Sequence, residues 1–449
     1  MFIKKIKKKF ENKYTSTFLS GLIAQQLAGC GGGASEEVAQ NVTLRGTSGN
    51  DLLVSNATYS AIEGLAGNDR IYGTSGPDEI YPGDGLDEVF AAAGDDVVNI
   101  YAFGDTIFGD EGNDTLVADF TDTQVLLRIS LQDGVIFNLR APSFERTTFS
   151  NIENFELHSD NSVEVIGTDF DNQIVTAGGN DTIIAGNGNN IINTGAGDDI
   201  ITFTSIGSSI DGGTGSDKLI YDASDLSGLV SVDLTSQVYQ LGGNSLNQRI
   251  SNFEIYEFQG VANFTITGTN NAEEIICADG NDTIDGLGGA DTLTGGNGSD
   301  KFVFSVLSNA LDTITDFETG INGDTIRLNK SVFDLAGNAL QSISTQSGGI
   351  KNILETTGVI LVNDETGFMS ETALISDLVG VNGIIDGQTN LGNLMVIWKK
   401  ANETSAVMSY VSDDTPSDSS LDYFENIALL TNITSANYSE LSITNFEII

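Results

Sequence analysis

Six consecutive nonapeptides fill residues 64–117: GLAGNDRIY, GTSGPDEIY, PGDGLDEVF, AAAGDDVVN, IYAFGDTIF and GDEGNDTLV. The sixth residue of each is aspartate, and the eighth is Ile, Val or Leu. A turn and a short strand therefore alternate in fixed proportion, with one carboxylate at the same point of every cycle. A period of nine with glycine at its corners predicts a parallel β-solenoid.

The same frame returns twice along the chain. Residues 167–220 give six further nonapeptides and residues 268–303 give four, while residues 46–63 add two in front of the first block. The eighth position is Ile, Leu, Val or Phe in all 18 copies, and the sixth is Asp in 13 of them. We therefore expect an all-β protein with three repeat blocks, at 46–117, 167–220 and 268–303.

The repeats resemble the RTX calcium-binding repeat, whose pattern is GGxGxDxUx with an apolar residue at U. The residues themselves suit that chemistry. Glycine at positions 1, 2 and 4 permits the positive φ that turns carbonyls toward one point, and oxygen-only ligation suits Ca²⁺. Position 8 should point inward and build the core. The resemblance implies a parallel β-roll in which two repeats make one turn, so that alternate loops stack on the same side and share ions.

This stacking assigns the candidate metal ligands of the first block to two sides. One side carries Asp51, Asp69, Asp87 and Asp105, and the other carries Asp78, Asp96 and Asp114. Ser60 stands before Asp78 and is a weak ligand. Phe103 occupies the glycine position before Asp105, so that loop departs from the pattern.

The other two blocks predict unequal sites. In the second block Asp181, Asp199 and Asp217 fall on one side, whereas the opposite side has only Asn172, Asn190 and Ser208. We expect calcium to bind well to the first side and poorly, if at all, to the second. In the third block Asp282 is paired with Asp300, and Glu273 with Asp291.

Two simpler readings compete with calcium binding. A single GxGxD is an ordinary turn in most proteins, but that reading does not explain 18 copies in phase. A metal-free solenoid would stack carboxylates at about 4.8 Å per rung, where they repel one another without a cation between them.

Composition supports several bound calcium ions. The chain has 63 acidic and 19 basic residues, for a net charge of −44. This acidic excess argues against nucleic acid as a partner and makes the metal-free chain resist compaction. Calcium binding should therefore be coupled to folding. In RTX proteins such coupling accompanies export, so the resemblance implies a secreted or extracellular protein.

Two duplicated inserts separate the blocks, at 118–166 and 221–267. SNIENFELHSDNSVEVIGTDFDNQI (residues 150–174) parallels SNFEIYEFQGVANFTITGTNNAEEI (residues 251–275), with an offset of 101 residues. The alternation in VEVIG and FTITG predicts strands. We expect each insert to add β-strands that continue or cap a roll.

The region 304–449 is predicted to be β-rich. Its Asp312–Phe317 and Gly323–Leu328 portions resemble the segment after the repeats in serralysin-type secreted proteases. The chain ends Phe446-Glu447-Ile448-Ile449, which resembles an uncleaved signal for type I secretion. The type I secretion apparatus is therefore an expected partner. A terminal β-strand is compatible with the same residues.

The first 45 residues are expected to be an export or anchoring segment, which would be an alternative to the C-terminal secretion signal. Six lysines in MFIKKIKKKFENK precede a modestly apolar stretch that ends LAGC, which resembles a lipobox with Cys30 as the lipidated residue. A membrane-touching amphipathic segment is a third reading. The two cysteines, Cys30 and Cys277, do not suggest a disulfide framework.

Nothing in the sequence marks a known catalytic apparatus. The chain has one histidine, His158, which argues against histidine-rich zinc sites and histidine-dependent triads. We therefore expect a non-enzymatic secreted or cell-surface protein with a structural or adhesive, surface-layer-like role. Its expected partners are calcium, further copies of itself or a cell-surface polysaccharide. The alternative is an extracellular polysaccharide hydrolase or lyase that acts through carboxylates.

Overall fold

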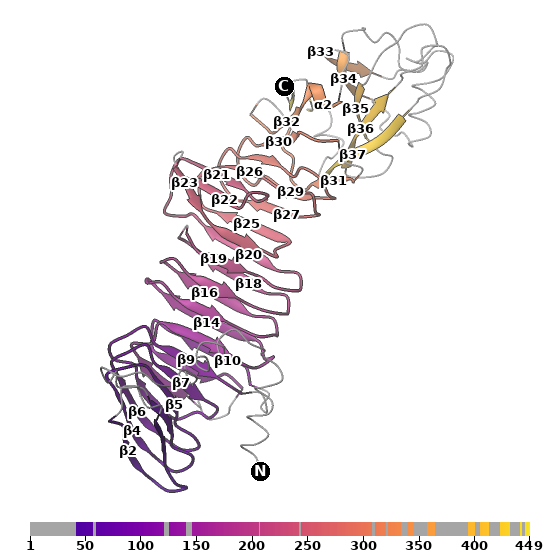
Figure 1. Cartoon of the computed structure of the whole chain (residues 1–449). Helices are drawn as coiled ribbons and strands as arrows, with labels where there is room; N and C mark the ends of the chain where they lie inside the picture. The colour runs from indigo at the N-terminus through magenta and orange to yellow at the C-terminus, as the bar shows by residue number, and fades with distance from the viewer. Residues whose placement is uncertain are drawn as a thin grey trace, which may run out of the picture. The chain divides into compact units, whose positions relative to one another are not determined.

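Short parallel strands follow one another along the chain and stack in ladders (Figure 1). The computed structural model describes residues 42–56, 60–120, 125–140, 146–205, 207–241, 244–307, 310–319, 322–333, 339–344, 357–363, 394–399, 405–412, 423–431, 441 and 445–449. Cys30 and nearly all of the N-terminal export or anchoring segment lie outside these residues. Nearly all of the regular secondary structure in the described residues is strand, as an all-β roll requires.

The first sheet contains one strand from each turn of the first two blocks, all parallel. Within each block its register steps by 18 residues, as in Ile62 opposite Ile80, so two nonapeptides make one turn. In order across the sheet the strands are β1 (Val42–Arg45), β3 (Ser60–Glu63), β5 (Asp78–Tyr81), β7 (Val97–Ile100), β9 (Thr115–Ala118), β13 (Asn154–Leu157), β15 (Gln173–Val175), β17 (Ile191–Asn193), β19 (Ser209–Asp211) and β24 (Arg249–Ser251).

The second sheet takes the other strand of each turn and passes through all three blocks. Its repeat strands are β2 (Leu52–Val54), β4 (Arg70–Thr74), β6 (Glu88–Ala92), β8 (Thr106–Phe108), β14 (Val163–Thr168), β16 (Thr182–Gly186), β18 (Ile200–Phe203), β20 (Lys218–Asp222), β25 (Ile255–Gln259), β27 (Glu274–Cys277), β29 (Thr292–Thr294) and β31 (Asp312–Ile314). Parallel pairing with an 18-residue step is the geometry expected of a β-roll.

The first insert bridges the second sheet with antiparallel strands. β12 (Arg146–Ser150) pairs in parallel with β8, and β11 (Val135–Asn138) and β10 (Leu127–Ser130) follow it in antiparallel order. β10 then pairs in parallel with β14. On the other side β13 pairs with both β9 and β15. The strands of the insert therefore continue both ladders from the first block into the second.

At the second insert the first sheet ends and a third sheet begins. β24 is the last strand of the first sheet, and β25 continues the second sheet. The third sheet consists of β23 (Asn244–Asn247), β22 (Val238–Leu241), β21 (Leu229–Asp233), β26 (Asn263–Thr267), β28 (Thr283–Asp285), β30 (Lys301–Phe304), β32 (Thr325–Leu328) and β38 (Phe446–Ile448). The first two pairings are antiparallel, and the rest are parallel.

Beyond the repeats the second sheet contains antiparallel as well as parallel pairings. β31 pairs in parallel with β37 (Tyr423–Thr431), and β36 (Ser405–Ser412) and β35 (Leu394–Lys399) follow in antiparallel order. β34 (Thr357–Asn363) and β33 (Ala339–Ser344) then pair in parallel. A four-residue helix, α2 (Lys330–Phe333), buries Phe333. β34 and β35 agree with the prediction that this region is β-rich.

The core is built from the eighth position of the repeats. All 18 of these side chains are buried, and most have no exposed surface at all: Leu53, Ile62, Ile71, Ile80, Val89, Val98, Ile107, Leu116, Ile174, Ile183, Ile192, Ile201, Ile210, Leu219, Ile275, Ile284, Leu293 and Phe302. They belong to one continuous hydrophobic cluster. The prediction that position 8 faces inward is confirmed.

Side chains on the outer faces also form ladders. Tyr72, Phe90 and Phe108 stack with centroid separations of 4.9 Å and interplanar angles of 8°. The guanidinium of Arg70 lies 5.5 Å from the Tyr72 ring centre and pairs with Glu88 at 3.0 Å. Since the rings cover one another's faces, this ladder stabilises the stack of turns.

Adjacent residues of β16 provide a direct test of the inward face. Ile183 has no exposed surface, whereas the side chain of Ile184 is 42% exposed. We expect Ile183→Ala to lower the free energy of unfolding by about 2–5 kcal/mol, because it opens a cavity in the core. Ile184→Ala, the matched control, should cost less than half as much. Denaturant unfolding at fixed calcium measures both, and equal losses would contradict the assignment of faces.

Candidate calcium-binding site

The position-6 carboxylates of successive turns are joined by hydrogen bonds from main chain to side chain. On one side of the first block the amides of Asp51, Asp69 and Asp87 donate to Oδ1 of the aspartate 18 residues onward, at 2.8, 2.8 and 3.0 Å. The series ends at Asp105. We call such a series a column and name it by its first and last residues, here the 51–105 column.

The same bond builds the other columns that the sequence predicts. In the 78–114 column, the amides of Asp78 and Asp96 donate at 2.7 and 2.8 Å. In the 181–217 column, those of Asp181 and Asp199 donate at 2.7 and 2.8 Å. In the third block the amide of Asp282 donates to Oδ1 of Asp300 at 2.8 Å, and the amide of Glu273 donates to Oδ1 of Asp291 at 2.9 Å. The predicted partners are therefore neighbours in the structure.

Most of these carboxylates keep one buried oxygen without a hydrogen-bond partner. The oxygens are Oδ1 of Asp78 and Oδ2 of Asp69, Asp87, Asp96, Asp114, Asp181, Asp199, Asp217, Asp282, Asp291 and Asp300. An ionised oxygen that is removed from water and left unpaired is costly, and a bound cation is one way of offsetting that cost.

Carbonyl oxygens from the next turn approach the same places. A Cβ on Gly64 would lie 2.1 Å from the carbonyl oxygen of Pro82 and 2.7 Å from Oδ2 of Asp69. A Cβ on Gly73 would lie 2.2 Å from the Ala91 carbonyl oxygen and 2.7 Å from Oδ2 of Asp78. Because Gly64 and Gly73 lack a side chain, the carbonyl oxygen of the next turn can lie close to the carboxylate of the same repeat at these two places.

Burial is the largest influence on the acidity of these groups. It raises the pKa of Asp96, Asp105, Asp181, Asp282 and Asp291 to about 7, and that of Asp114 and Asp217 to about 6. Amide hydrogen bonds oppose the shift, while neighbouring carboxylates add to it, as Asp114 and Asp78 do for Asp96. Negative charge in the columns is therefore unfavourable without a counterion.

The donor set fits Ca²⁺ better than other common metals. Each turn offers one carboxylate and several carbonyls, and such oxygens are the ligands that calcium prefers. Within the described ranges no three His, Cys, Asp or Glu side chains gather closely enough to hold a metal by themselves. An ion in a column would consequently depend on main-chain oxygens for most of its ligands, with carboxylates supplying the charge.

One side of the second block is built without charge. The Asn172 amide donates to Oδ1 of Asn190 at 2.9 Å, and the Asn190 amide donates to Ser208 at 3.0 Å. The side-chain nitrogens point at carbonyls: Asn172 Nδ2 donates to Glu153 O at 2.7 Å and Asn190 Nδ2 to Asn187 O at 3.0 Å. In this 172–208 column, amide hydrogens bond to main-chain oxygens that would otherwise be free to face a cation.

Four further carboxylates, which the sequence argument missed, receive the same amide bond. The main-chain amide of Asp114 donates to Glu153 at 2.8 Å, and that of Asp217 donates to Glu254 at 2.9 Å. The amide of Asp291 donates to Asp312 at 3.0 Å, and that of Asp300 donates to Asp324 at 2.9 Å. Glu153 and Glu254 occupy equivalent places in the duplicated inserts. That 101-residue offset was the available signal. Asp312 and Asp324 lie in the portions that resemble the serralysin segment.

The remaining residues singled out from the sequence lie apart from one another. Asp105 stays in its column despite Phe103, and its carboxylate is buried. His158 contacts Glu156 at 2.5 Å, and this hydrogen bond is the main cause that raises the His158 pKa. Cys277 is a buried thiol whose pKa is raised, chiefly by burial.

The fold and the columns define a class: a parallel β-roll with carboxylate-bearing turns. The sequence model of the RTX calcium-binding nonapeptide repeat matches in four copies, at residues 63–98, 102–122, 166–201 and 267–303. The chain is therefore an RTX-type calcium-binding repeat protein. Comparison with curated proteins finds no match. None of the helices in the described segments is long and apolar enough to cross a membrane.

The second block allows a charged column and a neutral column to be compared. Asp199 has a turn of its column on either side, so Asp199→Asn should remove charge from two adjacent sites and lower the number of bound calcium ions by up to two. The control is Asn190→Ala in the neutral column, for which we expect no change. Equilibrium dialysis with total calcium analysis measures both. Equal ion loss in the two variants would overturn the side assignment.

Proposed function

We propose that this chain is a secreted or cell-surface protein that folds on binding calcium and has a structural or adhesive role like that of a surface layer. The observation that carries the proposal is the set of buried carboxylate oxygens without partners in successive turns. They give calcium a stabilising role in most turns of the roll, which suits a protein that works as an extended scaffold.

The metal ligands proposed for this role are the position-6 acids of the repeats. They are Asp51, Asp69, Asp78, Asp87, Asp96, Asp105, Asp114, Asp181, Asp199, Asp217, Glu273, Asp282, Asp291 and Asp300. Their hydrogen-bonded order supports ions between successive members of each column. A bound Ca²⁺ would supply the positive charge that the columns lack, and would release the metal-free chain from self-repulsion.

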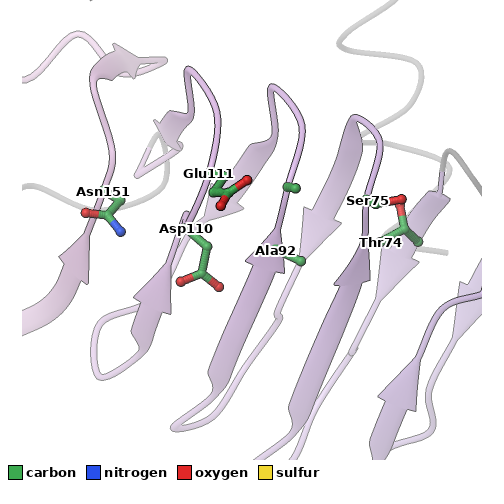
Figure 2. Close-up of a pocket in the computed structure, with 7 residues that line it drawn as sticks. Thr74, Ser75, Ala92, Asp110, Glu111 and Asn151 are labelled. Carbon is green, nitrogen blue, oxygen red and sulfur yellow. The ribbon is translucent and has the colours of Figure 1, made fainter.

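Several features favour a scaffold over a carboxylate-dependent hydrolase or lyase. The position-6 acids bind the amides of the preceding turns, which commits them to the structure. One open groove is lined by Thr74, Ser75, Ala92, Ala93, Asp110, Glu111 and Asn151 (Figure 2). Its two acids are adjacent in sequence and follow the outer side of the turns, so nothing about them sets an acid and a base on opposite sides of a glycosidic bond.

The division of the chain follows from this proposal. Residues 46–117, 167–220 and 268–303 are the calcium-binding blocks, and the inserts at 118–166 and 221–267 join them. Residues 1–45 would export or anchor the protein. Residues 304–449 would close the roll and carry the type I signal. Further copies of the chain or a cell-surface polysaccharide are the proposed partners.

Calcium should control folding. With chelator we expect an expanded chain with little β-structure, and with Ca²⁺ at about 10⁻⁴–10⁻³ M a compact β-rich one, because extracellular calcium modules bind in that range. Far-UV circular dichroism and hydrodynamic radius report folding, and light scattering reports assembly. Identical spectra and radii with and without chelator would refute calcium-dependent folding. Turnover of an added polysaccharide, without assembly, would favour the enzyme alternative.

The C-terminal type I signal and the lipobox at Cys30 make opposite predictions about export. If the C-terminal residues carry a type I signal, removal of the last seven residues should retain the protein inside the cell, while Cys30→Ser should leave secretion unchanged. If Cys30 is lipidated, Cys30→Ser should abolish surface attachment and the truncation should not. Fractionation of cells and medium distinguishes the two results.

A further inference from the structure

Each insert contains a three-residue turn where the repeats have a six-residue loop. Ser150 pairs with Phe108 and Asn154 with Thr115, so residues 151–153 stand opposite Gly109–Asp114. In the second insert Ser251 pairs with Asp211 and Ile255 with Lys218, so residues 252–254 stand opposite Gly212–Asp217. The turns read Asn-Ile-Glu and Asn-Phe-Glu, and the middle side chain is buried in both.

The asparagine of each turn supplies the carbonyl that a repeat loop would supply. A Cβ on Gly109 would lie 1.9 Å from the Asn151 carbonyl oxygen, as a Cβ on Gly64 would lie 2.1 Å from that of Pro82. At Gly212 the corresponding distance to the Asn252 carbonyl oxygen is 2.3 Å. Asn151 and Asn252 have φ of 52° and 61°, which asparagine tolerates better than most residues.

Figure 2 shows this continuation for the first insert. Thr74, Ala92 and Asp110 come from consecutive turns, and Asn151 follows them in the same row along the groove. The turn of the insert therefore lies where the next repeat loop would lie.

The glutamate of each turn supplies the carboxylate. Glu153 Oε2 accepts the Asp114 amide at 2.8 Å, the distance at which Asp114 Oδ1 accepts the Asp96 amide. Glu254 Oε2 accepts the Asp217 amide at 2.9 Å. Glutamate is one methylene longer than aspartate, and this extra reach compensates for a turn that is three residues shorter.

The aspartate bonded to each of these glutamates has one buried oxygen without a hydrogen-bond partner. Asp114 has no exposed surface, and its Oδ2 has no hydrogen-bond partner. This oxygen would lie 2.5 Å from a Cβ on Gly109, beside the Asn151 carbonyl oxygen. Asp217 is 1% exposed, and its Oδ2 also has no partner. At the end of the 78–114 column the carboxylates of Asp114 and Glu153 thus lie beside the Asn151 carbonyl. At the end of the 181–217 column the Asp217 amide is bonded to Glu254, and a Cβ on Gly212 would lie 3.1 Å from Cγ of Asp217.

We propose that the Asn151–Glu153 and Asn252–Glu254 turns each close a further calcium site, the first shared with Asp114 and the second with Asp217. The inference rests on the proposed binding of calcium by the columns. It assigns two ligands to the inserts, outside the nonapeptides, and makes each insert a calcium-dependent joint between one block and the next.

Substitutions that change charge or reach test the proposal in the full-length protein. Glu153→Gln keeps an acceptor for the Asp114 amide but removes the charge, and Glu153→Asp keeps the charge but shortens the reach. Each should lower the number of calcium ions bound per chain by one. Glu254→Gln should do the same, and the double variant Glu153→Gln with Glu254→Gln should lose two.

Glu156→Gln is the matched control, because Glu156 lies three residues onward in β13 and its side chain is 42% exposed. It should bind as many ions as the unaltered protein. Equilibrium dialysis at saturating calcium gives the stoichiometry, and circular dichroism verifies that the variants fold. Unchanged stoichiometry in the Glu153 and Glu254 variants would overturn the inference.

A calcium-soaked crystal of the unaltered protein gives an answer even if a variant does not fold. The expected result is an ion at about 2.3–2.6 Å from carboxylate oxygens of both Asp114 and Glu153. Ions within the columns but none at either turn would refute the inference and leave the proposed function standing. If the unaltered protein binds no calcium at all, both fail.

Discussion

The fold must accommodate columns of buried carboxylates that carry the same charge. In each column one oxygen of a carboxylate is held by the amide of the preceding turn, which fixes the side chain against its neighbour. In most of these carboxylates one oxygen is buried without a hydrogen-bond partner. The hydrogen bond draws the carboxylates into line at the spacing of β-strands, about 4.8 Å, where their repulsion is strong. The geometry that aligns the turns thus creates a need for positive charge.

Core and site are coupled because they share one strand alternation. Side chains two residues apart point to the same face of a strand, so position 6 and position 8 both turn inward. β5 illustrates this, since Asp78 and Ile80 are buried while Glu79 and Tyr81 are partly exposed. A shift of one residue in register would expose the aliphatic side chains and the carboxylates together. Any change that weakens one column therefore also loosens the core beside it.

The sequence was sufficient for the repeating part of the molecule. The period of nine predicted the turn and the buried eighth position, and the resemblance to RTX repeats implied the 18-residue register and the neighbours within each column. The sequence did not predict that a third sheet replaces the first at the second insert. That replacement depends on the pairing of β21 with β26, which are separated in sequence by 29 intervening residues. Residue patterns within a strand do not encode such a choice of partner.

The glutamates of the inserts were missed in the sequence analysis for a different reason. The repeat pattern requires aspartate as the sixth residue of a loop, whereas Glu153 is the third residue of its turn and carries a longer side chain. The turn is three residues shorter and the side chain one methylene longer. These two changes compensate each other in the three-dimensional structure, but they are not visible in the residue spacing. The duplication of the inserts preserved both changes, at Glu153 and Glu254, so a comparison of the two copies would have identified the turn without a structure.

The two sides of the second block separate the part of the site that shapes the chain from the part that needs an ion. The Asn172 amide reaches Asn190 at 2.9 Å and the Asp181 amide reaches Asp199 at 2.7 Å, so the same hydrogen bond from main chain to side chain forms in charged and neutral columns. Glycine placement and strand pairing therefore set the turn, whichever residue stands at position 6. In the neutral column the Asn190 side-chain nitrogen donates to the Asn187 carbonyl oxygen, whereas Asp199 has no hydrogen to give. In the proposed function calcium would accordingly neutralise a turn whose shape the sequence already specifies, and the need for it would vary from side to side with the residue at that single position.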